Sequence, residues 1–352
     1  MLDESVDGLG VSILSRDLKS MENRIDFTFG IITYNHSDYI LEHLESIKYQ
    51  ILNYGKGAGV KLVVSDDGSS DNTLEIIKKW ISYNADLFME CIILGDGVNR
   101  GVGHSFTNIW KHIGDEAFKV LAGDDVYSYE NIFLEANLLE KYDFVSGLPL
   151  LLIDGKILYK KNLMFHLYAT QHIYKNKTLL SKIKNISVIN TPSLLYRNKF
   201  IKDKSVFDFI RQFRVTEDFP MMASLSSIYP KLKFFTSDRV YIYYRRTKGS
   251  IYIVDSERYN KDKEDVFKYL INVDKSYIGR FLTRNRLFCY KAGGRIGKVL
   301  NIGYYIYLLR LLMALPKITS SMRGLRIDEE KHRTHYKKIV ERARRARWEL
   351  KI

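Results

Sequence analysis

Residues 65–73, with the sequence SDDGSSDNT, constrain the fold of this chain more than any other segment. They follow an apolar run at 60–64 and precede a stretch in which apolar residues recur at helical spacing. This order predicts a buried strand, a polar turn and a helix, with Asn72 and Glu75 spaced as a pair that caps the helix start. Because ligands of open α/β sheets bind at the carboxyl ends of the strands, the carboxylates of this turn are candidates for a binding site.

The same succession of strand, polar turn and helix occurs twice more. One apolar run, at 27–33, ends in the sequence YNHS, and another, at 117–122, ends in GDD before a helical stretch from Ser128. Between them a glycine-rich turn at 99–104 also leads into a helix. Strand and helix alternate through the first 140 residues, which predicts an α/β fold with a mostly parallel sheet covered by helices on both faces. The polar turns would then fall along one edge of the sheet.

Five segments, in a fixed order, resemble family 2 glycosyltransferases of the GT-A fold. These segments are TYNH at 33–36, SDDGSSDNT at 65–73, NRGVG at 99–103, AGDD at 122–125 and TED at 216–218. The resemblance covers roughly residues 24–250 and implies an inverting enzyme that uses a nucleotide-diphospho-sugar. It also implies a Rossmann-like, mostly parallel sheet flanked by helices. The chain departs from the family pattern at Ile32, where a proline is common, and at 123–125, where Gly-Asp-Asp stands in place of Asp-x-Asp.

The resemblance assigns the nucleoside of the donor to the first two turns. In the family pattern Thr33, Asn35 and Asp67 line the nucleoside pocket, with Asp66 beside them. A carboxylate that accepts a hydrogen bond from the imide N–H of the base would favour uracil or thymine over cytosine, which lacks this donor. UDP is also the commonest nucleotide of the family. The alternative is that Asp66 and Asp67 only shape the turn.

Asp124 and Asp125 are the candidate metal-binding residues. Negative charge grows on the leaving diphosphate as the glycosidic bond breaks, and Mn²⁺ or Mg²⁺ held by a carboxylate stabilises that charge as a Lewis acid. The resemblance implies that Asp125 is the direct ligand and that Asp124 contacts the ribose or a metal-bound water. Two carboxylates at close range repel each other, which also favours a cation between them. The alternative is that this pair caps the following helix, near Ser128.

The segment TED contains the candidate catalytic base. The acceptor hydroxyl must lose a proton as it attacks the anomeric carbon, and a carboxylate within hydrogen-bond reach is the expected base. By its match to the family pattern Asp218 is that base, and Glu217 orients it or binds the acceptor. One carboxylate base with a single displacement implies inversion. The alternative is that both residues stabilise the dipole at a helix start, where Pro220 suits the first turn.

Three arginines are candidates for contact with the diphosphate. Arg100, in the glycine-rich turn, faces a phosphate or lies exposed. Arg245 and Arg246 follow a strand-like run at 240–244, and the alternation of side chains along a strand places only one of them on the site side. That residue could clamp the diphosphate in a bidentate manner or form a surface ion pair.

These motifs divide the chain into three parts. An N-terminal extension at 1–23 precedes a catalytic domain at 24–250, and a helical, basic region follows at 251–352. Within the catalytic domain we expect a nucleotide-sugar-binding half at 24–150 and an acceptor-binding half at 151–250. The length of 352 residues and a hydrophobic content of 46% are ample for a packed core.

The net charge of +14 is concentrated near the C-terminus. From Lys317 to the end there are twelve lysines and arginines against five aspartates and glutamates, and an apolar, aromatic run at 299–315 precedes them. This combination favours an interfacial helix beside a basic tail on an anionic membrane surface. The alternatives are a membrane-spanning helix, for which about 17 residues is the lower limit, and a helical region that packs on the catalytic domain. The chain lacks the motifs of nucleic-acid-binding proteins, so we expect no nucleic-acid partner.

The remaining expectations concern location and task. The N-terminus has neither a basic head nor a long apolar run, which predicts that no signal peptide is present, and Cys91 and Cys289 are expected to be free thiols. With the family resemblance, these features favour a cytoplasmic protein, peripheral on the inner face of the cell membrane. Its acceptor would be a lipid-linked saccharide in the growth of a surface polysaccharide. A sugar nucleotidyltransferase, whose glycine-rich basic loop is missing at 33–36, and a catalytically silent nucleotide-sugar-binding module are the alternatives.

Overall fold

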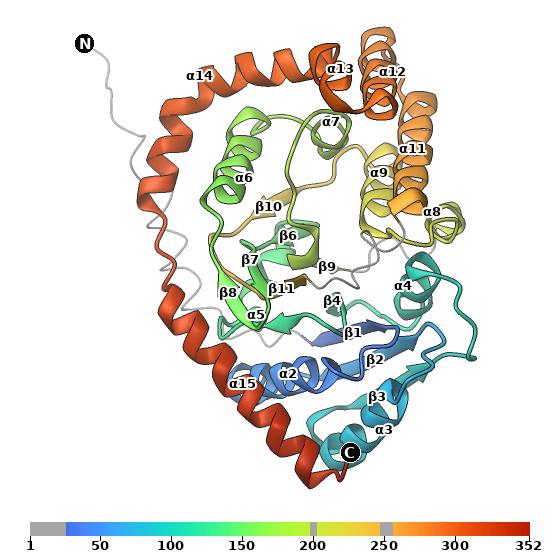
Figure 1. Ribbon diagram of the computed structural model, residues 1–352, viewed down its shortest axis with the longest axis vertical. Coiled ribbons are helices and arrows are strands. Elements are labelled where there is room, and N and C mark those ends of the chain that lie inside the picture. Colours follow the sequence, from blue (N-terminus) through green and yellow to red (C-terminus); the bar gives the residue numbers. More distant parts are fainter. Residues whose placement is uncertain (1–25, 198–202, 247–255) are drawn as a thin grey trace.

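The computed structural model describes residues 26–197, 203–246 and 256–352. The expected N-terminal extension at 1–23 and the expected domain boundary at residue 250 lie outside the described residues. Two sheets form the centre of the molecule, and helices surround them (Figure 1).

Within the described ranges, a seven-stranded sheet forms the larger of the two. Its strands, in spatial order, are β10 (Phe234–Thr236), β6 (Phe144–Ser146), β9 (Leu194–Arg197), β4 (Ala117–Ala122), β1 (Phe27–Thr33), β2 (Val60–Asp66) and β3 (Glu90–Leu94). The neighbouring strands β4, β1, β2 and β3 are parallel, as the alternation of strand and helix predicted. Strand β9 lies antiparallel between β4 and β6. The mostly parallel sheet is therefore confirmed, with one reversed strand inserted in it.

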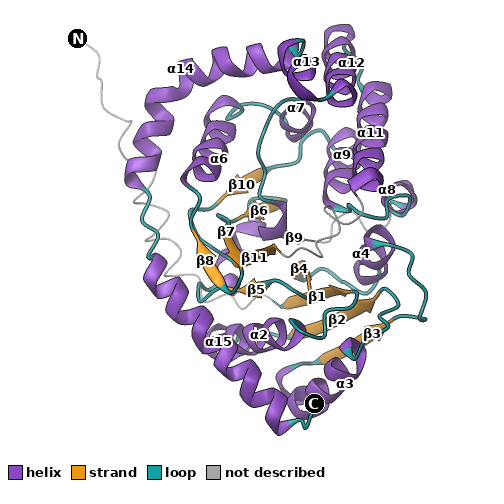
Figure 2. Cartoon of the chain, viewed as in Figure 1, coloured by secondary structure: helices purple, strands orange, loops and turns teal. Residues whose placement is uncertain are grey.

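Helices cover both faces of this sheet (Figure 2). The helices of this part are α2 (Ile40–Tyr54), α3 (Thr73–Asn84), α4 (Val102–Trp110), α5 (Ile132–Ala136), α6 (Lys161–Ile173), α7 (Leu179–Lys184), α8 (Lys204–Ile210) and α9 (Asp218–Ile228). Phe29 and Ile31 of β1 pack in one core with α2 and α3, whereas Ile32 packs in another with α4, α8 and α9. Successive side chains of a strand point to opposite faces, so a strand covered on both sides is apolar along its length.

A second, four-stranded sheet carries part of the site. Its strands, in spatial order, are β5 (Val126–Tyr127), β11 (Ile242–Arg246), β7 (Leu150–Ile153) and β8 (Lys156–Leu158). Strands β7 and β8 form a hairpin whose turn residues, Asp154 and Gly155, have φ values of 49° and 71°. Two positive φ values are typical of a two-residue hairpin turn. Strand β5 begins directly after Asp125, so the chain that leaves the GDD turn enters this second sheet.

The C-terminal part is helical, as expected. Its helices are α11 (Ser256–Val273), α12 (Tyr277–Ala292), α13 (Gly294–Val299), α14 (Ile302–Gly324) and α15 (Glu329–Glu349). Helix α14 packs along α6, and α15 packs on α2 and β8 (Figure 1). Ala343, Ala346 and Leu350 of α15 belong to the same core as β1 and β2. The basic end of the chain is therefore a helix that packs on the catalytic part through its apolar side.

The apolar run at 299–315 continues from the end of α13 into α14. Of the helices within the described ranges, none is both long enough and apolar enough to cross a membrane. The cysteines Cys91 and Cys289 are free, as expected.

Hydrogen bonds at the start of α3 differ from those predicted. Asn72 precedes the helix, but its side chain makes no capping hydrogen bond. The carboxylate of Asp71 binds there instead: Oδ1 accepts from the N–H of Thr73 at 2.9 Å, and Oδ2 accepts from the N–H of Ser37 at 3.0 Å. The expected Asn72–Glu75 cap is therefore wrong, because Asp71 can bind the helix start and the preceding polar turn at the same time.

The helix expected from Ser128 begins four residues later. It starts at Ile132, and the side chain of Asn131 caps it. The Ser128 hydroxyl instead donates to the carbonyl of Val240, because the chain after Asp125 first pairs with β11. The alternative that the GDD carboxylates cap this helix is therefore wrong.

Candidate active site

The carboxyl ends of β1, β2 and β4 meet at one edge of the seven-stranded sheet. Thr33, the last residue of β1, is paired in register with Asp66, the last residue of β2. The N–H of Asp67 donates to the carbonyl of Thr33 at 2.9 Å, and the N–H of Gly123 donates to the carbonyl of Ile32 at 2.9 Å. The expected grouping of the polar turns along one edge is confirmed.

Asp66 and Asp67 both bind groups of the loops around them. Asp66 closes its own turn, where Oδ2 accepts from the N–H of Ser69 at 2.9 Å and Oδ1 accepts from the Ser69 hydroxyl at 2.5 Å. The carboxylate of Asp67 accepts from the N–H of Arg100 at 2.8 Å and from that of Gly101 at 2.9 Å. Burial raises the pKa of Asp67, and these two N–H groups oppose the shift. Asp66 thus shapes its turn, and Asp67 attaches the glycine-rich loop to the same edge.

Asn35 connects the first turn to the second. It has a φ of 53°, a left-handed conformation that asparagine tolerates better than most residues. Its Oδ1 accepts from the N–H of Ser70 at 2.8 Å, and its own N–H donates to the hydroxyl of Ser69 at 2.9 Å. Thr33 is fully buried, with its hydroxyl 3.4 Å from Nδ1 of His36. Of the two predicted nucleoside contacts in this turn, Asn35 is the exposed one.

The glycine-rich loop presents its backbone to the site. The side chain of Arg100 forms an exposed ion pair with Asp96 at 2.6 Å, so the exposed alternative for Arg100 is the one observed. Gly101 has a φ of 93°, which favours glycine. A Cβ atom on Gly103 would lie 2.3 Å from the carbonyl oxygen of Ile210, so a close backbone approach requires glycine there. The backbone of this loop therefore lies at the edge of the seven-stranded sheet, whereas the Arg100 guanidinium does not.

Asp125 is buried where β4 passes into the second sheet. Its Oδ1 accepts from the N–H of Arg245 at 2.7 Å, and its carbonyl accepts from Nδ1 of His43 at 2.8 Å. Burial lowers the pKa of His43 to about 3, so the imidazole is neutral and supplies no charge. Burial, and then the charge of Asp124, raise the pKa of Asp125 well above its ordinary value. A buried carboxylate beside a second carboxylate gains stability from a bound cation.

The donor set around Asp125 fits a metal that is shared with a substrate. Within the described ranges, no group of three or more His, Cys, Asp and Glu side chains is placed to hold a metal ion. A cation would therefore be held by Asp125, with Asp124 next to it, and would take its other ligands from water and a diphosphate. Mg²⁺ is commonly bound in this way, through one or two carboxylates and the phosphates of a substrate.

Arg245 and Arg246 have different surroundings, as the alternation along a strand predicted. The buried Arg245 forms an ion pair with Glu42 at 2.5 Å, and its Nε donates to the carbonyl of Asp124 at 2.5 Å. The hydroxyl of Tyr336, on α15, donates to the same Glu42 carboxylate at 2.9 Å. Arg246 is exposed. The structure places Arg245 at the site, where it holds the backbone of the GDD turn, and leaves Arg246 outside it.

Glu217 and Asp218 lie at the start of α9, as expected. Asp218 Oδ1 accepts from the N–H of Phe219 at 2.6 Å, and Oδ2 accepts from the hydroxyl of Thr191. Burial, and then the charge of Asp218, raise the pKa of Glu217 to about 8. At neutral pH Glu217 is therefore mostly protonated, which suits it to donate a hydrogen bond rather than to act as a base.

Lys119 is a site residue that the motifs did not reveal. It lies in the centre of β4, fully buried, and its Nζ donates to the carbonyls of Pro192 and, at 3.4 Å, Leu194. Burial lowers the pKa of Lys119 to about 7, and the carboxylates of Asp125 and Glu217 oppose this shift. Lys119 therefore lies near enough to Asp125 and Glu217 for their charges to counteract the effect of burial on its pKa. A single lysine within the apolar strand AFKVLA is the signal that could have identified it.

Comparison with known proteins gives one family and several similar structures. The family model described as glycosyl transferase family 2 matches residues 28–204. The crystal structure of S. aureus TarS has a TM-score of 0.53 at 17% identity, over 89% of this chain and 55% of that one. The structure of TarS 1–349 in complex with UDP-GlcNAc has a TM-score of 0.52 at 19% identity, over 90% of this chain and 92% of that one.

A mannosyltransferase, PcManGT from Pyrobaculum calidifontis, was solved in complex with GDP-Man and Mn²⁺. It has a TM-score of 0.54 at 13% identity, over 96% of this chain and 93% of that one. These likenesses confirm the expected fold. This chain covers 55% of the longer TarS structure, so it spans about half the length of that protein. No curated protein matches the sequence.

Proposed function

Because the chain belongs to glycosyl transferase family 2, we propose that it transfers a sugar, with inversion, from a nucleotide-diphospho-sugar to a saccharide acceptor. The observation that carries this proposal is a chain of contacts between β4 and α9: Lys119 of β4 binds the carbonyl of Pro192, and the neighbouring Thr191 binds Asp218. Such a transfer needs a cation-binding carboxylate at the leaving diphosphate and a base at the attacking hydroxyl. The site has one candidate for each role, Asp125 after β4 and Asp218 at the start of α9.

In this mechanism Asp218 takes the proton of the acceptor hydroxyl as the hydroxyl oxygen attacks the anomeric carbon. Hydrogen bonds from Thr191 and Phe219 orient the Asp218 carboxylate. Glu217 keeps its proton below about pH 8 and can donate a hydrogen bond to the acceptor. The bond between the anomeric carbon and the diphosphate breaks on the face opposite to the attack, so one displacement inverts the centre. A Mn²⁺ or Mg²⁺ ion held by Asp125 would stabilise the charge of the leaving diphosphate.

For the donor we propose a UDP-sugar. The nucleoside would lie against the edge that carries Asn35, Asp66 and Asp67, next to Thr33. Asp67 accepts hydrogen bonds from two backbone N–H groups and retains lone pairs that the imide N–H of uracil could use. The structures with UDP-GlcNAc and GDP-Man show that both nucleotides occur among similar folds, so the choice requires a direct test.

The test is thermal unfolding with UDP, GDP, dTDP or CMP, each with and without Mn²⁺. A nucleotide at 100 times its dissociation constant should stabilise the protein by about 2.7 kcal/mol, and UDP with Mn²⁺ is expected to give the largest shift in melting temperature. A larger shift with GDP or dTDP would contradict the choice of UDP. The absence of a shift with every nucleotide would contradict the transferase itself.

We further propose that the protein works at the inner face of the cell membrane, on a lipid-linked saccharide. Support comes from exposed apolar side chains on α12, α13 and α14. They include Ile278, Phe281, Phe288, Ile296, Val299, Tyr305, Leu309, Leu312 and Met313. The exposed cations Arg284 and Lys317 lie on the same helices, α12 and α14. An apolar surface with interspersed cations is typical of binding to anionic lipid.

Vesicle binding tests this membrane contact. The protein should sediment with vesicles of phosphatidylglycerol and phosphatidylcholine, and much less with phosphatidylcholine alone, because the cations require an anionic surface. The double substitution Leu309→Glu and Leu312→Glu on α14 should abolish sedimentation. Leu52→Glu, an exposed leucine of α2, is the matched control and should sediment as the wild type does. Equal binding of both variants would show that α14 is not the contact surface.

A further inference from the structure

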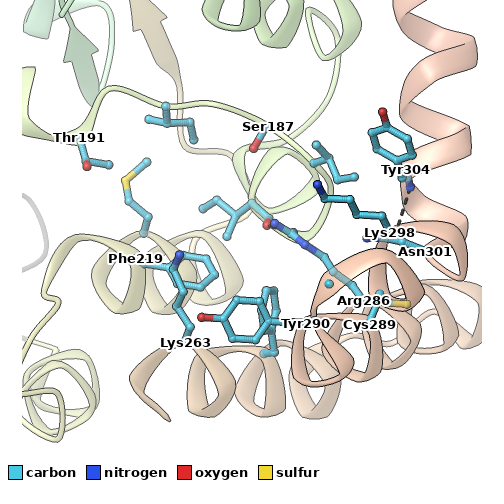
Figure 3. A pocket seen from close by; sticks show the side chains of 18 residues that line it. Ser187, Thr191, Phe219, Lys263, Arg286, Cys289, Tyr290, Lys298, Asn301 and Tyr304 are labelled. Carbon is cyan, nitrogen blue, oxygen red and sulfur yellow. Dashed lines mark hydrogen bonds between the residues drawn. The ribbon is translucent and has the colours of Figure 1, made fainter. Parts of the chain in front are cut away.

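A cavity lies next to the candidate base, lined by Thr191 and Phe219 among others. Its volume is about 660 Å³, and its walls come from α7, α9, the first turn of α14 and the intervening helices α11 to α13 (Figure 3). None of the sequence motifs points to it. A pocket of this size is in the range that binds small organic ligands.

The cavity reaches the candidate base through two of its wall residues. Thr191 and Phe219 both line it, at one end of the view in Figure 3. The Thr191 hydroxyl and the Phe219 N–H are also the two groups that bind the carboxylate of Asp218. The cavity thus ends at the two groups that hold the Asp218 carboxylate, next to the place that an acceptor must occupy if Asp218 is the base.

The charged side chains that line the cavity are all cations. Lys263, Arg286 and Lys298 contribute to the wall, and no aspartate or glutamate does so among the described residues. In Figure 3, Lys298 extends into the centre of the cavity, towards Arg286. Nζ of Lys263 lies 4.4 Å from the centre of the Tyr259 ring, and no ion pair of Lys263 with a carboxylate is present among the described residues.

Arg286 is the most enclosed of these cations. Its Nη1 donates to the carbonyls of Ile183, Lys184 and Asn185 at 2.9 to 3.1 Å, and its guanidinium lies 4.9 Å from the centre of the Phe267 ring. These partners are neutral, and burial lowers the pKa of Arg286 to about 10. A buried guanidinium with only neutral partners gains from an anionic ligand.

The rest of the wall is apolar. Ile186, Ile189, Met222 and Phe267 line it, and Tyr304 joins it to the exposed apolar surface of α14. A ligand that binds here would thus need an anionic group for the cations and an apolar group for the remaining wall. It could enter from the side that we propose to face the membrane.

We propose that this cavity is the acceptor site, and that the acceptor carries a phosphate ester next to an apolar chain. A phosphate ester offers several oxygens that can bind Lys298, Arg286 and Lys263 together, which a single carboxylate does less well. The inference rests on the proposed transferase function, because it takes Asp218 as the base. It adds the chemical class of the acceptor to that function.

Binding of hexyl phosphate to the full chain tests the proposal, measured by calorimetry in the presence of UDP and Mn²⁺. Hexyl phosphate should bind, whereas hexyl glucoside, with the same chain and no charge, and inorganic phosphate, with no chain, should bind much more weakly. Lys298→Gln should weaken the binding of hexyl phosphate about tenfold, as expected for the loss of one charge-assisted hydrogen bond. Arg295→Gln, an exposed cation of the same helix α13 that does not line the cavity, is the matched control.

Three results would overturn the proposal: equal binding of hexyl phosphate and hexyl glucoside, equal binding of inorganic phosphate, or equal effects of the two substitutions. The UDP titration of the same samples separates this outcome from failure of the transferase function. Wild-type protein that binds UDP with Mn²⁺ but not hexyl phosphate would refute the acceptor site alone. Protein that binds neither would refute the function on which it rests.

Discussion

Asp218→Asn should lower the rate of sugar transfer about 10²–10⁴-fold, the usual contribution of a general base, while the affinity for the donor stays unchanged. The asparagine side chain has the same shape, and its Oδ1 can still accept from the N–H of Phe219. It cannot take the proton of the attacking hydroxyl. Asp218 binds Thr191 and Phe219 and makes no hydrogen bond or ion pair with Asp125 among the described residues, so the substitution should leave the proposed metal ligand in place.

The rate can be measured without the natural acceptor, as the slow release of UDP when water attacks the donor. Asp208→Asn, which changes an exposed carboxylate of α8, is the matched control and should hydrolyse the donor as the wild type does. Calorimetric titration with UDP and Mn²⁺ measures donor binding. An Asp218→Asn protein that releases UDP at the wild-type rate would disprove the assignment of the base and favour a role in binding only.

Asp125→Asn should have opposite effects on the free protein and on the complex. In the free protein, burial and the charge of Asp124 raise the pKa of Asp125, so its ionised form destabilises the fold. A carboxyl with a raised pKa contributes its full stability below its unfolded pKa, and this contribution is lost as the pH rises. Asparagine stays neutral, so the melting temperature of the variant should exceed that of the wild type increasingly from about pH 4 upwards.

The complex should show the reverse. With UDP and Mn²⁺ at 100 times the dissociation constant, the wild type gains about 2.7 kcal/mol, and the variant should lose the metal-dependent part of this gain. The measurement is thermal unfolding from pH 4 to pH 8, with and without UDP and Mn²⁺. Asp115→Asn, an exposed carboxylate outside the site, should change neither the free protein nor the complex. A variant that keeps the metal-dependent shift would show that Asp125 does not hold the metal.

Much of the catalytic part could be predicted because its signals are local. The strands β1, β2 and β4, the polar turns at their ends and the start of α9 at Asp218 all follow from apolar periodicity and turn chemistry within short segments. The parallel pairing of the strands followed from the helices between them. These rules depend only on neighbouring residues, so one sequence was sufficient.

Other features could not be predicted because they depend on distant segments. The antiparallel strand β9 joins the sheet between β4 and β6, and β5 diverts the chain away from the helix expected after Asp125. Lys119 belongs to no recognisable motif. Its surroundings are the carbonyls of Pro192 and Leu194, which accept its hydrogen bonds, and two carboxylates outside its own strand that affect its pKa. The cavity is built from six helices that no local pattern brings together.

By itself the sequence determined that carboxylates and polar turns gather at the ends of parallel strands, because the hydrophobic pattern and the turn-forming residues are features of short, continuous segments. Only the tertiary structure decided which of those groups are ionised and which already form hydrogen bonds or ion pairs within the protein. The backbone N–H of Arg245 donates to Asp125, which is 120 residues away in the sequence, and the hydroxyl of Tyr336 donates to Glu42, which is 294 residues away. Burial and hydrogen-bond partners set the protonation of a group, and both are properties of the packed chain rather than of any one segment of it.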